Sequence, residues 1–339
     1  MNEENKTEQL KYDIYVNENE TVYISQEDVK NLFDKTIYYD YKCNQIITTS
    51  DTKVANIQVN EKKMIVNNSN VSMLDSIIKI NNNLYLPISD MEIVYNIKVE
   101  YIKSSNRVII DELSKGMISA TVSENTDIKF KPRALSKNIG TLKQGETVSC
   151  FYTTSKGWRQ IRTSDGTIGY IKANKLSSQY IIRQDMLERG EATVISLDNY
   201  NNKEFEILND KVIIRNIFTI KENDIEILEK LDIDRENYKI WTSITNENLN
   251  SKENDILKEI LANCKTRTVF INLIVKKVIE NDINGIIIKF NELEDKEILE
   301  RFVIECTPKL REIGITTGIV LNENMQKENY IDIVDYIVE

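Results

Sequence analysis

The pattern of hydrophobic and polar positions along the chain predicts three regions of different structure. Residues 1–115 combine short apolar strands with brief helical spacing and polar turns, which is typical of an α+β domain. Residues 116–180 hold short alternating segments between glycine-containing turns, which predicts a small all-β barrel. In residues 186–339, apolar runs alternate with amphipathic helical segments, the pattern of a parallel α/β domain. The chain is therefore predicted to be multidomain.

The first region contains an internal repeat. Residues 22–49 align without a gap on residues 84–111, and the alignment superposes Asp28 on Asp90 and Asn44 on Asn106. Each copy predicts a strand, a helix opened by Ser or Asp, and a hairpin whose turn holds the Asn. No Gly precedes Gly116, so these turns depend on Asn and Asp, which tolerate left-handed backbone. The two aspartates are read either as a paired site or, as favoured here, as helix-capping residues.

This repeat resembles the small domain named after the amino-terminal domain of copper amine oxidases. The string LYLPISDM matches the strand-to-helix step typical of that domain, which occurs in many Gram-positive envelope proteins. Copper would require imidazole ligands, and the chain contains no His. We therefore expect neither a metal site nor a cofactor.

The second region resembles a bacterial SH3 domain, on the string GWRQIRTSDGTIGYI. In extracellular proteins that module commonly contacts peptidoglycan. Trp158 and Tyr170 are then candidates for stacking on sugar or peptide, although side chains at these places more often fill the core. Arg159 and Arg162 are candidates for wall carboxylates, with a solvated rim as the alternative.

The third region has six candidate strands with amphipathic helices between them. One helix is expected to be capped by Ser251, and another to begin after Asp295, be kinked near Pro308 and end at Gly314. The carboxyl ends of the first and third strands carry Asp198 and Glu247, which could reach a ligand. The candidate strands are Ala192–Leu197, Val212–Phe218, Tyr238–Ser243, Gly285–Phe290, Thr316–Leu321 and Ile333–Val338.

The run from Asn281 to Leu293, NDINGIIIKFNEL, resembles the fourth strand of the family 18 glycoside hydrolases, chitinase-like (β/α)8 TIM-type barrels whose signature is a D-G-I-N-I-D-F-E type string. In that family the last Glu is the general acid, and an Asp two residues earlier holds the acetamide of the substrate, a substrate-assisted retaining mechanism. Here the acid is replaced by Asn291 and the assisting Asp by Lys289, while Asn284 and Ile287 occupy the more distant acidic or polar positions. An amide has no proton to give at neutral pH, and losing a general acid costs about 10²–10⁴-fold in rate.

Two further side chains of the third region are candidates for function. Glu292 follows Asn291 directly, but side chains alternate along a strand, so it points away from the interior unless a bulge shifts the register. Trp241, within the third-strand string KIWTSIT, is a candidate ligand-binding aromatic. We expect no catalytic residue among the degenerate positions, with Glu292 as the possible rescue.

A whole eight-stranded barrel takes about 250 residues. The third region is shorter, so its barrel is expected to be incomplete. Its edges at Ala192–Leu197 and Ile333–Val338 are predicted to be unpaired, which invites a protein partner or self-association. Cys43, Cys150, Cys264 and Cys306 are scattered singly and are expected to be buried free thiols.

Composition narrows the classes of partner. The net charge of −10 is spread along the chain without a basic stripe, which argues against nucleic acid. No apolar run approaches the about eighteen residues of a membrane span, and the polar start MNEENKTEQLKYD has no signal-like core.

The resemblances place the protein in the extracytoplasmic envelope or the spore, where it is expected to bind cell-wall glycan or peptidoglycan, or to scaffold a partner, without catalysis. Two alternatives remain open: an active N-acetylglucosaminyl-glycan hydrolase, and a structural protein without glycan affinity. The sequence does not specify the glycan, the oligomeric state or whether Met1 and Glu339 are natural ends.

Overall fold

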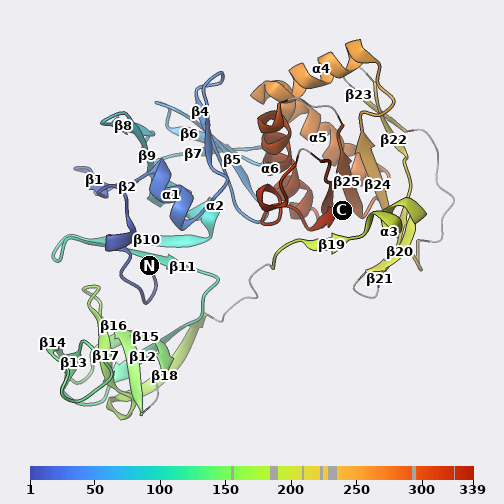
Figure 1. Cartoon of the computed structure of the whole chain (residues 1–339). Coiled ribbons are helices and arrows are strands. Elements are labelled where there is room, and N and C mark those ends of the chain that lie inside the picture. The colour runs from blue at the N-terminus through green and yellow to red at the C-terminus, as the bar shows by residue number, and fades with distance from the viewer. Residues whose placement is uncertain are drawn as a thin grey trace. The chain divides into compact units, whose positions relative to one another are not determined.

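The chain forms two compact units. A computed structural model describes residues 1–153, 156–183, 190–207, 210–221, 224–227, 235–291, 295–323 and 325–339. The second unit takes Thr36–Val59 and Met64–Val71 from the amino-terminal region and joins them to the described residues beyond 189, while the other described residues form the first unit (Figure 1). The described part is mostly β, with several sheets and some helices.

The internal repeat is confirmed down to matching hydrogen bonds. Ser25 caps the first helix, and the Asp28 carboxylate accepts the backbone N–H groups of Lys11 and Tyr12. Asp90 accepts those of Leu74 and Asp75 in the same way. Both aspartates thus fix the chain that precedes their repeat, which corrects the expectation that they cap helices: Ser25 caps α1, and the turn at Ile88–Met91 has no side-chain cap. The elements are β1 (Tyr15–Val16), β2 (Val22–Ser25), α1 (Gln26–Leu32), β8 (Ile78–Ile80), β9 (Asn83–Pro87), α2 (Glu92–Tyr95), β10 (Ile97–Ile102) and β11 (Arg107–Glu112), with short 3-10 turns at Thr7–Gln9 and Ile88–Met91.

The hairpin turns of both copies are held by asparagine, as expected. Asn44 and Asn106 have φ values of 52° and 49°, in the left-handed region. Each Asn side chain also accepts a hydrogen bond from a tyrosine hydroxyl, Tyr39 to Asn44 at 2.6 Å and Tyr101 to Asn106 at 2.9 Å. A polar side chain that hydrogen-bonds locally can therefore do here what Gly does in most tight turns.

Residues 117–183 form a seven-stranded antiparallel sheet around a small apolar core. The strand order is β14-β13-β17-β16-β15-β12-β18. The Asp165-Gly166 turn between β16 and β17 is confirmed, with Gly166 at φ 80°. The strands are β12 (Met117–Val122), β13 (Thr126–Lys129), β14 (Asn138–Leu142), β15 (Thr147–Thr153), β16 (Trp158–Arg162), β17 (Ile168–Lys172) and β18 (Leu176–Arg183), with a 3-10 turn at Ala173–Lys175.

The second unit is built on a largely parallel sheet of order β19-β27-β26-β25-β24-β21-β20. Of the two expected unpaired edges, the one at 192–197 remains on one side of β19, but the one at 333–338 is wrong, because β27 pairs in parallel with both β26 and β19. The sheet ends instead at the outer sides of β19 and β20. Its strands are β19 (Thr193–Ile195), β20 (Glu204–Ile207), β21 (Asp210–Ile214), β24 (Lys239–Thr245), β25 (Gly285–Lys289), β26 (Thr316–Val320) and β27 (Tyr336–Val338). A separate hairpin is formed by β22 (Phe218–Lys221) and β23 (Asp224–Ile227).

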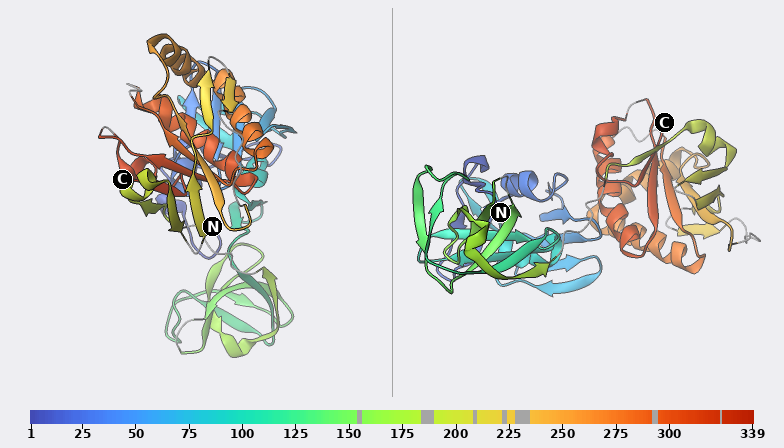
Figure 2. Two further views of the ribbon diagram at one scale, coloured as in Figure 1. Left: turned by 90° about the vertical axis from the view of Figure 1, so that its right-hand side faces the viewer. Right: turned by 90° about the horizontal axis from the view of Figure 1, so that it is seen from below.

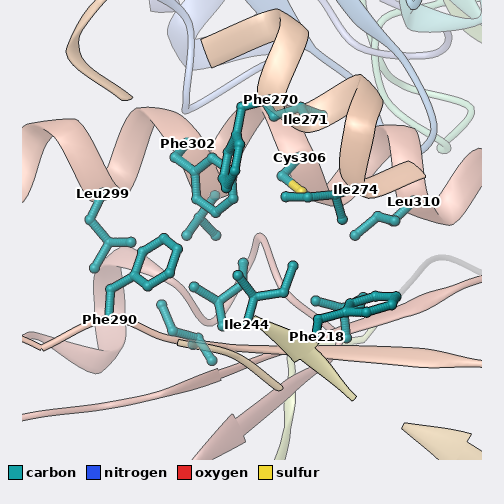
Figure 3. Packing of buried hydrophobic residues seen from close by; sticks show 14 of the residues in the cluster. Phe218, Ile244, Phe270, Ile271, Ile274, Phe290, Leu299, Phe302, Cys306 and Leu310 are labelled. Carbon is teal, nitrogen blue, oxygen red and sulfur yellow. The ribbon is translucent and has the colours of Figure 1, made fainter. Parts of the chain in front are cut away.

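Three helices pack on one face of this sheet and bury its main core (Figure 2). Phe290 after β25 lies close to Phe302 of α6, with ring centroids 5.7 Å apart, and Phe270 of α5 lies next to Phe302 (Figure 3). Asn250 with Glu253 forms a capping box on α4, so Ser251 is the first helical residue rather than the cap. Asp295 caps α6, as expected. The helices are α3 (Leu197–Asn202), α4 (Ser251–Ala262), α5 (Cys264–Glu280) and α6 (Lys296–Glu312), with a 3-10 turn at Lys327–Asn329.

The opposite side of α6 is covered by strands from the amino-terminal region. These strands form a five-stranded antiparallel sheet whose β4 and β5 contact α6. Helix α6 is therefore buried over most of its carboxy-terminal half, including Cys306, Thr307 and Leu310. No helix among the described residues is both long and apolar enough to cross a membrane. The strands of this sheet are β3 (Tyr38–Asp40), β4 (Gln45–Thr49), β5 (Val54–Gln58), β6 (Lys63–Val66) and β7 (Ser69–Ser72).

A buried ionic group, here called the Arg267 cluster, joins β3 to α5 and α6. It consists of Tyr38, Asp40, Arg267 and Glu305. The Arg267 side chain is 0% exposed and donates from Nε to Glu305 Oε1 at 2.7 Å, from Nη1 to the Leu261 carbonyl at 2.7 Å and from Nη2 to the Tyr38 hydroxyl at 3.1 Å. Asp40 Oδ2 lies 3.5 Å from Arg267 Nη2. Burial, reinforced by the charge of Glu305, raises the pKa of Tyr38 well above its ordinary value, so its hydroxyl donates to Glu305.

A disulfide joins the same surfaces, which corrects the expectation of four free thiols. Cys43 follows β3 and Cys264 opens α5, and the two are bonded although 221 residues separate them in the chain. Cys150 and Cys306 remain free and buried. Scattered single cysteines carry no pairing information in the sequence, which is why the bond could not be predicted.

Thiol titration tests the disulfide. Without reductant, the denatured protein should show two reactive thiols, and four after reduction. Neither thiol should react quickly in the native state, because burial raises the pKa of Cys150 to about 11 and that of Cys306 to about 12, and the thiolate is the reactive form. As control, unreduced Cys43→Ser should show three thiols. Four thiols in the unreduced wild-type protein would refute the bond.

Substitution of Arg267 tests the buried cluster. Arg267→Met should lower the free energy of unfolding by roughly 3–5 kcal/mol, because it leaves Glu305 and Asp40 buried without their cation. Arg235→Met is the matched control: it removes an exposed pair with Asp282 and should cost about 0–1 kcal/mol. Equal losses in urea denaturation of the two variants would contradict the role given to Arg267.

Candidate functional site

The alternation of β25 places two polar side chains on the sheet face opposite the helices. Ile286, Ile288 and Phe290 belong to the helix-covered core. Ile287 belongs instead to a second apolar cluster on the other face, and Lys289 and Asn291 continue its side of the strand. The sequence-based assignment of Lys289 and Asn291 to one face therefore agrees with the burial of their neighbours.

Lys289 is held by a small polar group, here called the Lys289 cluster, made of Tyr200, Glu247, Lys289 and Asn291. Its ammonium Nζ lies 2.7 Å from Glu247 Oε1 and 5.7 Å from the ring centroid of Tyr200. The amide of Asn291 donates to the same Glu247 oxygen at 3.1 Å. Tyr200 in turn lies within hydrogen-bonding distance of Ser243, at 3.1 Å between their hydroxyl oxygens. One carboxylate thus serves both an ammonium and an amide.

The loop after β24 is fixed against the end of β25 by reciprocal amide hydrogen bonds. Asn291 N donates to Asn246 Oδ1 at 2.8 Å, and Asn246 Nδ2 donates to the Asn291 carbonyl at 2.7 Å. Asn246 Nδ2 also donates to Asn254 Oδ1 of α4 at 2.8 Å. These bonds hold Glu247 beside Lys289. Sequence reasoning named Glu247 as a strand-end side chain that could reach a ligand, but its pairing with a residue 42 positions later had no local signal.

Trp241 lies in the core below this cluster rather than at an open surface. Its side chain is buried, with ring centroids 5.8 Å from Phe205 and 4.9 Å from Tyr336. Gly285 lies directly against the indole: a Cβ at that position would come within 2.6 Å of the ring. Its burial favours packing over ligand binding for Trp241.

The other predicted positions of this region have varied surroundings. Asn284 accepts the backbone N–H of Ile240 at 2.9 Å, which joins β24 to the start of β25. Ile287 is fully buried. Asp198 is exposed on α3. Glu292 lies outside the described residues, so its orientation stays a prediction.

The predicted ligand residues of the small β domain divide between core and surface. Trp158 is buried, and Arg162 forms a buried two-point salt bridge to Asp111 at 2.7 and 2.8 Å, which leaves it no free face for a wall carboxylate. Arg159 donates to Gln179 at 3.0 Å. Tyr170 is half-buried and lines a cavity in the first unit. Of the four side chains, that of Tyr170 is the aromatic one that lines a cavity, as stacking on a ligand requires.

One group of potential metal ligands occurs among the described residues. The ligand atoms of Asp40, Cys43 and Cys264 lie within 4.8 Å of one another. The two sulfurs are bonded to each other and so are not the thiolates that soft metals require. With no His in the chain, these donors do not fit copper.

Comparison with protein families identifies the amino-terminal module. Residues 4–110 match the copper amine oxidase N-terminal domain. This confirms the resemblance stated for the internal repeat. A comparison with curated proteins finds no match.

Solved structures similar to the chain include a putative glycosylase, a spore cortex-lytic enzyme and a chitinase. A putative sporulation-specific glycosylase from Bacillus subtilis has 20% identity and a TM-score of 0.33, covering 39% of this chain and 50% of that one. The spore cortex-lytic enzyme SleL from Bacillus megaterium has 17% identity and a TM-score of 0.33, covering 47% and 44%. A Group IV chitinase from Ostrinia furnacalis has 15% identity and a TM-score of 0.31, covering 44% and 50%. The chain spans about half the length of each of these structures.

The contact between Gly285 and Trp241 allows the packing beneath the Lys289 cluster to be tested by a stability measurement. Gly285→Ala should lower the free energy of unfolding by roughly 1–3 kcal/mol, because the added methyl group overlaps the indole. Gly318→Ala on the neighbouring strand is the control, since its Cβ would meet other atoms no closer than 3.5 Å. If urea denaturation gave equal stabilities for the two variants, Trp241 would be free to move and not packed as described.

Proposed function

We propose that the protein is a non-catalytic component of the cell envelope or spore that binds N-acetylglucosamine-containing glycan such as peptidoglycan. The main support is the salt bridge of Lys289 to Glu247 at 2.7 Å. In the family 18 pattern that β25 resembles, Lys289 stands at the assisting carboxylate and Asn291 at the general acid. An ammonium there opposes the positively charged intermediate of substrate-assisted cleavage, and the amide cannot protonate the leaving oxygen.

The domain interpretation accompanies this proposal. Residues 1–115 are taken as the copper amine oxidase N-terminal-like domain, 116–180 as a bacterial SH3 domain, and 186–339 as a partial family 18-like TIM-type barrel. In the barrel, β21, β24, β25, β26 and β27 correspond to strands two to six and are neighbours in that order, whereas β19, the expected first strand, pairs with β27 and not with β21. The parallel pairing of these five strands and the burial of both sheet faces support the correspondence of strands two to six.

The disulfide supports an extracytoplasmic location. Bonds such as Cys43–Cys264 form and persist in oxidising surroundings and are rare in the reducing cytosol. The bond is independent of the resemblances from which the location was first expected. A spore or envelope protein therefore agrees with both lines of reasoning.

A hydrolase is the second candidate, and Glu247 is the observation that favours it. This exposed carboxylate lies at the carboxyl end of the sheet, where family 18-like barrels hold their substrates, and it contacts Lys289 and Asn291, two of the four degenerate positions. Its oxygen, however, accepts from an ammonium and an amide at once. A carboxylate engaged in this way is placed as a structural partner of Lys289 rather than as a proton donor.

Hydrolysis assays distinguish the two candidates. Incubation of the full chain with N-acetylated chito-oligosaccharides, vegetative peptidoglycan or spore-cortex peptidoglycan should release no reducing ends above a heat-denatured control. Glu247→Gln and Glu292→Gln should not change that result. Wild-type turnover that either substitution abolishes would establish the hydrolase and overturn the proposal. Co-sedimentation with purified cell walls tests affinity separately, and a soluble protein left entirely in the supernatant would favour a purely structural role.

A further inference from the structure

The first unit contains a cavity of about 810 Å³ that lies far along the chain from the Lys289 cluster. One wall comes from the β10–β11 hairpin, the other from the small β domain, and residues of the amino-terminal segment complete the lining. The volume falls within the about 300–1,000 Å³ of small-ligand sites. The cavity is thus large enough for more than a single small ion or metabolite.

The two walls are held together by direct bonds. Arg162 of β16 bridges to Asp111 of β11, and both side chains are buried. Arg107 donates to the Asp165 carbonyl at 2.9 Å and to the Thr167 hydroxyl at 2.8 Å. Because these bonds span the cavity walls, the lining is preformed and a ligand would lose little free energy in ordering it.

Aromatic rings are the main feature of the lining. Tyr12, Tyr101, Phe130 and Tyr170 come from four separate segments and face the same cavity. Phe130 is 59% exposed, so its ring is accessible to a ligand. Flat apolar rings of this kind suit a ligand that has a flat apolar face of its own.

The charged part of the lining argues against an anionic ligand. The cationic side chains among the described lining residues are already paired within the protein: Lys6 with Glu4, Lys11 with Glu27, Arg107 with Asp165 and Arg162 with Asp111. Amides of Asn5, Asn106 and Gln160 also line the cavity and can both donate and accept hydrogen bonds. Rings for stacking together with amides match a neutral sugar, which has apolar ring faces and a polar edge.

We propose that this cavity, shared by the two amino-terminal modules, is the glycan-binding site of the protein and takes a short run of neutral N-acetylated sugars. The inference rests on the proposed glycan-binding function and names the residues that perform it. Phe130 and Tyr170 stack on the sugar rings, and the amides bind hydroxyl and acetamide groups. Trp158, buried in the core, takes no direct part.

Calorimetric titration of the full chain with N-acetylchitotetraose tests the proposal. Phe130→Ala and Tyr170→Ala should each weaken binding at least about tenfold, the equivalent of losing about 1.4 kcal/mol of contact. Phe130→Trp should keep the affinity, because it retains a ring for stacking. Tyr41→Ala is the matched control, since Tyr41 is 81% exposed in the second unit and does not line the cavity. Circular dichroism spectra like that of the wild type would show that the variants fold.

The possible results separate this inference from the function on which it rests. If the wild type binds the tetrasaccharide and the two alanine variants bind equally well, the cavity is not the site, although glycan binding stands. Binding of a peptidoglycan stem peptide in place of the tetrasaccharide would likewise overturn the sugar assignment. Failure of the wild type to bind either the tetrasaccharide or purified cell walls would remove both the cavity site and the proposed function.

Discussion

The second unit depends on the burial of one guanidinium group. Arg267 is fully enclosed, and a buried cation is tolerated only where its charge and its N–H groups are satisfied. Its partners come from three places in the chain: β3, the end of α4 and α6. The amino-terminal strands are therefore part of the structure that makes the carboxy-terminal helices stable, and the Cys43–Cys264 bond fixes the same contact covalently.

Features that depend on neighbours in sequence could be predicted, and features that depend on distant partners could not. The repeat and its asparagine turns follow from local backbone rules, and both are present. The aspartates were expected to cap helices but instead bind backbone N–H groups 15–17 residues earlier in the chain, which local rules do not reveal. The Arg267 cluster joins residues more than 200 positions apart, and no periodicity marks them. The pairing of β19 with β27 has the same origin, because counting strands does not reveal which edges meet.

The site shows the same division within a few residues. Alternation along β25 predicted that Lys289 and Asn291 share a face, since a strand's two faces follow directly from its period of two. Alternation could not predict that Glu247 pairs with Lys289. That pairing is set by the adjacent strand and by the amide contacts of Asn246 with Asn291. The role of Trp241 could not be assigned from sequence for a related reason: an aromatic residue in a strand looks alike in sequence whether it meets a ligand or a glycine.

The contacts of Lys289 bear on whether the proposed absence of catalysis could be reversed by a single substitution. Exchanging Lys289 for Asp would remove the cation and place a second carboxylate beside Glu247, where like charges disfavour each other. The loop that carries Glu247 is fixed by Asn246 and Asn291 in the position that suits an ammonium. Because the surroundings are complementary to the amine, cleavage chemistry at this place would require a different loop as well as different side chains. Under the proposal, glycan recognition can then reside in the amino-terminal cavity, whose aromatic and amide lining does not depend on the Lys289 cluster.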